Sequence, residues 1–168
     1  MTTSPERCLP PTWRFVFKHP AHFLAFGFGA GLSPAAPGTA GTLVALPLYA
    51  VMARALPPAF AFAALAVLFV LGIWATGVTG KALGVADHGG MVWDEIVAFI
   101  MVLYCIPGTI FWTAAGFVLF RLFDILKPFP IGWLDRSVKG GVGVMLDDLL
   151  AAAYTIASVA LLQRMFNV

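Results

Sequence analysis

The sequence predicts an all-α fold, a polytopic membrane helical bundle in which loops on the cytoplasmic side form the candidate site. Apolar residues make up 61% of the 168 residues and charged residues 11%, whereas ordinary soluble domains have roughly 45–50% and about 25%. The mean hydropathy is +0.93. Apolar runs of helical length recur along the whole chain, separated by short segments rich in Pro, Gly and charge. We therefore expect one membrane-embedded domain over residues 1–168.

The first two segments are polar or irregular. Residues 1–20 contain four prolines with basic and aromatic side chains between them, which predicts a tail that becomes an interfacial segment. Gly27–Thr42 is rich in Gly and Pro and predicts an ordered loop that opens into a helix. Two interpretations stay open for this loop. It is a tight packing turn, or its backbone N–H groups together with Ser33, Gly38 and Thr39 bind a phosphate.

Five apolar stretches are the candidate membrane helices. They are residues 39–55, 59–77, 92–106, 109–125 and 149–166. The third and fourth form a hairpin, because Pro107-Gly108 turns the chain between them. Each arm is shorter than a typical span of about 20 residues, so either the arms cross obliquely or they form a partly re-entrant pair. Polar loops precede and follow this hairpin.

Basic residues are distributed unevenly between the two ends of the predicted spans. Eight of the ten Lys and Arg residues fall on the side that carries the acids, whereas Arg54 and Arg164 fall on the other. The positive-inside rule makes the acidic side cytoplasmic. No signal peptide is visible, so we expect the chain to insert through its own spans. The two cysteines are expected as free thiols.

The net charge of +2 is too small to indicate a nucleic-acid-binding protein. We expect a phospholipid substrate and a membrane as the partners of this chain, and no obligatory protein partner.

Carboxylates gather in one part of the chain. Seven of the eight acids lie within residues 87–148. Folding the hairpin back on itself brings Asp94 and Glu95 to the same depth as Arg121 and Asp124. A further acidic pair, Asp147 and Asp148, opens the last apolar segment and can lie beside these acids at the same depth.

A hard divalent cation is the interpretation we favour for these acids. A carboxylate at the edge of the hydrocarbon is costly unless it is paired or bound to a cation. Several oxygen ligands without Cys or clustered His indicate Mg²⁺. The predicted ligands are two adjacent doublets with no cation nearby in the sequence: Asp94, Glu95, Asp147 and Asp148. For Asp135, in contrast, we expect an ion pair with Arg136 or Lys139.

Basic residues near the predicted metal site are suited to phosphate oxygens. These candidate substrate ligands are Arg121, Lys127 and Lys139. Carboxylates and basic residues together indicate metal-assisted phosphoryl chemistry on a membrane lipid.

Four segments carry a resemblance to a known family. They read GFGAGLSPAAPGTAGTL, DHGGMVWDEIVAF, FRLFDILKPFPIGWLDR and KGGVGVMLDDLLAA, and they occur in this order between about His22 and the last span. At these residues the chain closely resembles phosphatidylglycerophosphatase A, the bacterial membrane enzyme that removes the terminal phosphate of phosphatidylglycerol phosphate. The resemblance implies a magnesium-dependent phosphatase of the bacterial inner membrane with an all-helical fold. It marks as the acidic core Asp94, Glu95, Asp124, Asp147 and Asp148.

Two chemical routes stay open for such an enzyme. In the first, water activated by the metal attacks phosphorus directly. In the second, Asp124 or Asp148 forms a covalent aspartyl-phosphate. His88 either protonates the leaving alkoxide or is a loop histidine bonded to the backbone.

Two other classes of function share some of these features. A CDP-alcohol phosphotransferase also combines membrane helices with aspartates and magnesium, but its Asp-Gly pairs with an Ala-Arg between them are absent from this sequence. A divalent-cation carrier usually places ionisable groups near the bilayer midplane, whereas the acids here cluster at the ends of the predicted spans.

Overall fold

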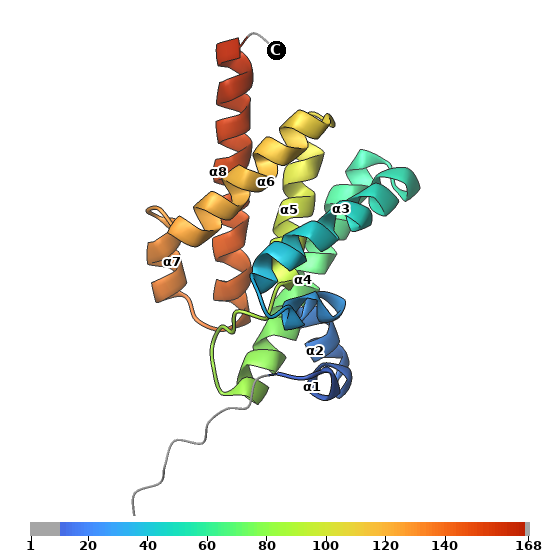
Figure 1. The fold of residues 1–168 in the computed structure, drawn as a ribbon, viewed down its shortest axis with the longest axis vertical. Coiled ribbons are helices and arrows are strands. Elements are labelled where there is room, and N and C mark those ends of the chain that lie inside the picture. The colour runs from blue at the N-terminus through green and yellow to red at the C-terminus, as the bar shows by residue number, and fades with distance from the viewer. Residues whose placement is uncertain (1–10, 167–168) are drawn as a thin grey trace, which may run out of the picture.

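The computed structural model describes residues 11–166, and in this range it is helical without any strand (Figure 1). The all-α prediction is thus confirmed for the described residues. The first half of the predicted interfacial segment lies outside them. The elements are α1 (Trp13–Phe17), α2 (Pro20–Ala25), the 3-10 helix η1 (Gly27–Leu32), α3 (Pro37–Ala55), α4 (Pro58–Leu83), α5 (Trp93–Cys105), α6 (Ile110–Leu126), α7 (Ile131–Ser137) and α8 (Gly141–Phe166).

Helix α5 is the centre of the bundle. It packs against α3, α4 and α8, and every residue from Trp93 to Ile100 is buried. A helix that is apolar all round after its first turn is typical of a buried position. Helices α6 and α7 pack on α8, and the short α2 packs on α4. The first turn of α5, which carries two acids, is therefore enclosed by the other helices.

Close contact between α4 and α8 depends on glycines. The sulfur and terminal methyl of Met145, and the indole of Trp93, occupy the space where a Cβ of Gly72 would lie. At Gly141 a Cβ would meet the carbonyl oxygen of Ile73 in the α4 backbone. Only glycine permits the two backbones to approach this closely.

The last helix begins earlier than the sequence predicted. It starts at Gly141 and not at Leu149, because its glycine-rich first turn packs directly on α4. Asp147 and Asp148 therefore lie within a long helix and do not open it. The predicted loop before this helix also contains a short helix, α7. The hairpin turn at Pro107-Gly108, in contrast, is confirmed, since α5 ends at Cys105 and α6 begins at Ile110.

Two described helices are long and apolar enough to cross a membrane, by length and composition: α4 and α8. The hairpin arms α5 and α6 have 13 and 17 residues, which is shorter than the roughly 20 residues of a full span. Membrane association is thus supported by two helices, and the polytopic topology stays a prediction.

Substituting Gly141 tests the contact between α4 and α8. In Gly141→Ala the new methyl meets the Ile73 carbonyl, and overpacking of this kind costs about 1–3 kcal/mol. We expect the Tm of the detergent-solubilised protein to fall by at least about 2 °C. Gly108→Ala is the matched control, because no atom lies within 4 Å of a Cβ there. Equal Tm values for both variants would contradict the close packing.

Candidate functional site

Three carboxylates from two helices meet where α5 packs on α8. Asp94 and Glu95 lie in the first turn of α5, and Asp148 lies on α8. One oxygen from each of them lies within 4.8 Å of the others. Acidic side chains in the first turn interact favourably with the helix N-terminus, so this position suits Asp94 and Glu95. We call Asp94, Glu95 and Asp148 the acid group.

The acid group is buried and short of partners. Asp94 is 7% exposed, Glu95 9% and Asp148 2%. Among the described residues, no hydrogen-bond partner is found for Asp94 Oδ1, Glu95 Oε2 or Asp148 Oδ2. Buried carboxylates without partners are strongly destabilising. Hard divalent cations such as Mg²⁺ and Ca²⁺ are held by carboxylate oxygens, so the donor set of the acid group fits such an ion.

Arg121 connects the acid group to α6. Its Nη1 lies 3.3 Å from Glu95 Oε1 and 2.8 Å from Asp124 Oδ2. Its buried Nε lacks a hydrogen-bond partner within residues 11–166. The guanidinium is therefore fixed by two acids on one side and still has donor capacity.

The beginning of α3 adjoins the acid group as well. A Cβ on Gly38 would collide with Glu95 Oε1 and would lie 2.9 Å from both terminal nitrogens of Arg121. Pro37 begins the helix and Thr39 follows in its first turn, where backbone N–H groups have no partner inside the helix. The Gly-rich loop, for which phosphate binding was one of two interpretations, is thus brought to the acids at Gly38. Ser33 instead donates its hydroxyl hydrogen to the Ala35 carbonyl at 2.8 Å, and its predicted substrate role stays a prediction.

Lys127 holds two other acids. Its Nζ lies 2.9 Å from Asp135 Oδ1 and 2.6 Å from Asp147 Oδ2. Asp147 Oδ1 accepts a hydrogen bond from the Asp148 N–H at 3.0 Å. Both oxygens of Asp147 therefore have protein partners, and this separates Asp147 from the other three predicted metal ligands. Asp135 is paired with Lys127, so the prediction of an ion pair with Arg136 or Lys139 is wrong. Lys139 instead donates to the Asp135 backbone carbonyl at 3.0 Å.

The charge state of Lys127 follows from these contacts. Burial alone would lower the pKa of Lys127, but hydrogen bonds and charge interactions with Asp147 and Asp135 outweigh it and raise the pKa above its ordinary value. Lys127 therefore stays an ammonium throughout the physiological pH range.

Asp87 is a neighbour of the site that the sequence did not single out. Partial burial raises the pKa of Asp87; Lys127 opposes this shift, and the carboxylates of Asp135 and Asp124 add to it. Asp87 lies at the rim of the site, in the connector between α4 and α5. Its position immediately before His88 in a polar segment is the sequence feature that could have identified Asp87 as a site residue.

His88 matches one of its two predicted roles. Its Nδ1 accepts a hydrogen bond from the Gly90 N–H at 3.0 Å, and its ring lies 6.0 Å from that of Phe26. These contacts are those of a loop histidine bonded to the backbone. These contacts do not support the general-acid role, which stays a prediction.

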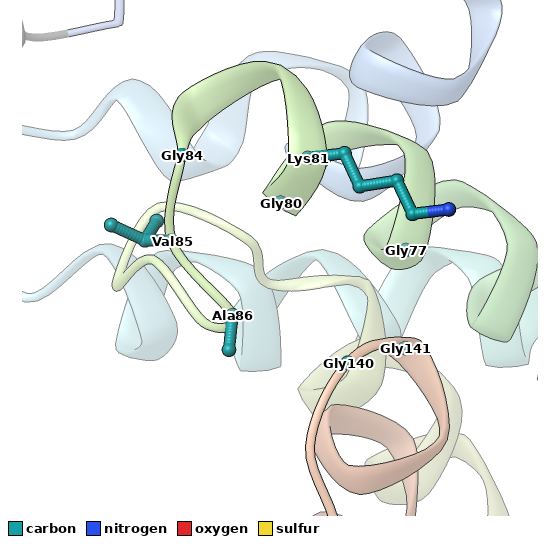
Figure 2. Close-up of a pocket in the computed structure, with 8 residues that line it drawn as sticks. All are labelled: Gly77, Gly80, Lys81, Gly84, Val85, Ala86, Gly140 and Gly141. Atoms are coloured by element: carbon teal, nitrogen blue, oxygen red, sulfur yellow. The ribbon is translucent and has the colours of Figure 1, made fainter.

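A cavity of about 440 Å³ lies at the junction of the end of α4 and the beginning of α8 (Figure 2). Glycine backbone and small apolar side chains form most of its wall, and Lys81 is the one charged residue that lines it. Because no carboxylate lines the cavity, it is distinct from the acid group and is unsuited to a cation.

Fold and site define a class: helical, membrane-associated proteins with a buried group of carboxylates beside basic side chains. Within this class, a profile of the phosphatidylglycerophosphatase A family matches residues 23–163. The chain belongs to this family of phosphatases, and the resemblance seen in the four motifs is confirmed.

Three relatives show how closely the sequences agree. Phosphatidylglycerophosphatase A of Escherichia coli is 43% identical over 139 residues, which cover 82% of this chain and 80% of that protein. The protein of the same name from Haemophilus influenzae is 42% identical over 154 residues, or 91% of this chain and 94% of the relative. A protein named putative phosphatidylinositol-3-phosphatase, from Bacteroides thetaiotaomicron, is 41% identical over 141 residues, which cover 80% of this chain and 87% of that protein. No solved structure matches the chain.

Removing one carboxylate of the acid group tests it as a cation site. We expect Asp148→Asn to weaken binding of Mn²⁺, a probe for Mg²⁺, by at least about tenfold, because substitution of groups that merely orient metal ligands already costs about 10–100-fold. Electron paramagnetic resonance of free Mn²⁺ measures this affinity. Unchanged affinity in Asp148→Asn would remove this residue from the site.

Asp147→Asn tests whether Asp147 is a ligand or a partner of Lys127. From the observed contacts we expect the Mn²⁺ affinity to change by less than about twofold, whereas loss of the ion pair raises the KM for the lipid substrate by about tenfold. Metal titration and steady-state kinetics on the same preparation separate the two effects. A loss of Mn²⁺ affinity as large as in Asp148→Asn would make Asp147 a ligand, as the sequence predicted.

Proposed function

We propose that this chain hydrolyses phosphatidylglycerol phosphate to phosphatidylglycerol and phosphate, with Mg²⁺ as cofactor. Family membership supports a phosphatase, and the relatives from E. coli and H. influenzae carry the name phosphatidylglycerophosphatase A. The single observation that carries the metal is the acid group, in which buried carboxylate oxygens lack protein partners among the described residues. When bound, Mg²⁺ would neutralise phosphate charge and lower the pKa of water.

Arg121 is the side chain best placed to bind the phosphate. Glu95 and Asp124 fix its guanidinium, and its planar fork matches phosphate oxygens in a bidentate geometry. Gly38 lies against the same guanidinium, so the N–H groups in the first turn of α3 can complete the phosphate site. Gly38 thereby allows the helix backbone to come close to the anion.

Lys127 supplies a second positive charge near the acids. Asp135 and Asp147 hold its ammonium from α7 and α8, which limits the conformations of a flexible side chain. Lys139 lies further out, bonded to the backbone of Asp135, where it can attract the anionic lipid before it binds.

Direct attack by water is the route that we propose. Asp124 already forms an ion pair with Arg121, which suits a residue that orients the guanidinium. Asp148 belongs to the acid group, and binding of a cation would engage its carboxylate. Isolation of a phosphorylated aspartate during turnover would contradict this route and favour the covalent one.

We further propose that the protein is a multi-pass protein of the bacterial inner membrane, with the acid group at the cytoplasmic side. The apolar helices α4 and α8 support membrane insertion. Arg121, Lys127 and Lys139 belong to the site end of the molecule, whereas Arg54 and Arg164 lie in the last turns of α3 and α8. This distribution agrees with the positive-inside rule.

The central test is phosphate release by the purified protein from phosphatidylglycerol phosphate in mixed micelles. We expect release with Mg²⁺ and its loss with a chelator. Asp94→Asn should lower kcat by on the order of 10²-fold or more, comparable to the removal of other preorganised electrostatic groups. Arg164→Gln, at the far end of α8, should retain full activity.

Other lipids and products distinguish the alternatives. Phosphatidylinositol phosphate belongs in the same assay, because one relative carries the name of a phosphatase for that headgroup. Preference for it over phosphatidylglycerol phosphate would overturn the proposed substrate. Release of CMP from a CDP-lipid would indicate a phosphotransferase. Uptake of Mn²⁺ into proteoliposomes without phosphatase activity would indicate a carrier.

A further inference from the structure

A row of aromatic rings runs along the N-terminal part of the molecule and ends beside the acid group. Trp13 stacks on Phe17 with ring centroids 5.7 Å apart, and Phe17 stacks on Phe23 at 5.5 Å. Phe23 meets Phe28 edge to face at 5.4 Å, and Phe28 meets Trp93 in the same way at 5.6 Å. We call the rings of Trp13, Phe17, Phe23 and Phe28 the aromatic edge.

The aromatic edge is more exposed than large apolar side chains usually are in water. Trp13 is 55% exposed, Phe17 67% and Phe28 41%. Contiguous exposed apolar surface of this kind marks an interaction site with a protein or a membrane. The aromatic edge is therefore a candidate binding surface for a partner that packs against aromatic rings.

The backbone is strained where Phe28 is presented. Phe28 has a φ of 60°, a left-handed conformation that is unfavourable for a residue with a bulky side chain. Gly29, beside it, has a φ of 101°, and the ring of Trp13 fills the space where its Cβ would lie. The loop thus holds an exposed ring in a costly conformation, and such strain is typical of functional positions.

The charge around the edge is positive. Arg14 and Lys18 are exposed beside the rings, and residues 11–86 of the described chain contain no Asp or Glu. Trp and Tyr are enriched at membrane interfaces, and Lys and Arg near a membrane surface are attracted by anionic lipids. A positive edge with exposed aromatic rings therefore complements anionic headgroups better than a neutral surface.

The edge is attached firmly to an apolar helix that can cross a membrane. The Nδ1 of His22 lies 3.0 Å from the Thr79 hydroxyl in a buried contact between α2 and α4. The ring of His19 lies 6.1 Å from that of Trp74 on α4. Burial and the nearby charges of His19 and Lys18 lower the pKa of His22, which keeps it neutral and suited to this hydrogen bond.

We propose that the aromatic edge binds the headgroup region of anionic phospholipids in the bilayer around the protein, with Arg14 and Lys18 paired to lipid phosphates. Because Phe28 contacts Trp93 and Trp93 precedes Asp94, this docking sets the depth of the acid group relative to the headgroups. The proposal concerns the surrounding lipid and not the hydrolysed substrate. It holds whichever phosphate ester the site accepts.

Quenching of Trp13 fluorescence tests this docking. The full chain is reconstituted in phosphatidylcholine vesicles that contain the same mole fraction of brominated phosphatidylglycerol or brominated phosphatidylcholine. The difference in emission between the native protein and Trp13→Phe isolates Trp13 from the other four tryptophans. We expect the brominated anionic lipid to quench this difference at least about twofold more strongly, because each basic residue near the surface favours anionic lipid by severalfold.

Charge variants complete the experiment. In the double variant Arg14→Gln, Lys18→Gln the preference for the anionic lipid should disappear, as it should at high salt. Arg54→Gln, an exposed arginine at the end of α3, is the matched control and should keep the preference. If neither lipid quenches Trp13, the edge lies in water and the proposal is wrong. Equal quenching by both lipids would contradict the preference for anionic headgroups.

Discussion

The site depends on one electrostatic constraint: three carboxylates are held together where α5 packs on α8 and water is largely excluded. Like charges at this spacing repel strongly in a low-dielectric interior. The three carboxylates stay together because apolar packing extends along α5, with Phe99 and Ile100 almost fully buried. The bundle thus supplies the free energy that keeps the acid group assembled, and the acid group gains from any positive charge placed among its oxygens.

The remaining acids of the site show how the chain neutralises carboxylates with its own side chains. Asp124 is bound by Arg121, and Lys127 binds both Asp135 and Asp147. Each of these acids has a cation within hydrogen-bond distance. In the acid group, Glu95 Oε1 has Arg121 as a partner, whereas the buried oxygens Asp94 Oδ1, Glu95 Oε2 and Asp148 Oδ2 have no partner within the described chain. The same small region therefore contains acids that are satisfied internally and acids that need an external cation, and this contrast supports an ion at the acid group.

The helical class, the turn at Pro107-Gly108 and the meeting of distant acids were predictable from local sequence features. Composition indicates the class, the Pro-Gly break indicates the turn, and the geometry of a hairpin brings the acids together. None of these inferences requires knowledge of side-chain packing. The partner of Asp147 was not predictable in this way. Adjacent residues of a helix point about 100° apart, so Asp147 faces Lys127 while Asp148 faces the acid group. The early start of α8 was missed because glycine disfavours helices, whereas contact with α4 requires it at Gly141.

The geometry also separates recognition of phosphate from recognition of the rest of the lipid. Arg121, Gly38 and Glu95 of the acid group lie against one another, and a phosphate monoester presents the same oxygens whichever alcohol it is attached to. Relatives of about equal identity, 43% and 41%, carry the names of phosphatases for different headgroups. Discrimination between headgroups requires a difference in contacts outside the phosphate. The irregular segments around the site, which contain Ser33 and Asp87, are where such a difference can arise without disturbing the carboxylates.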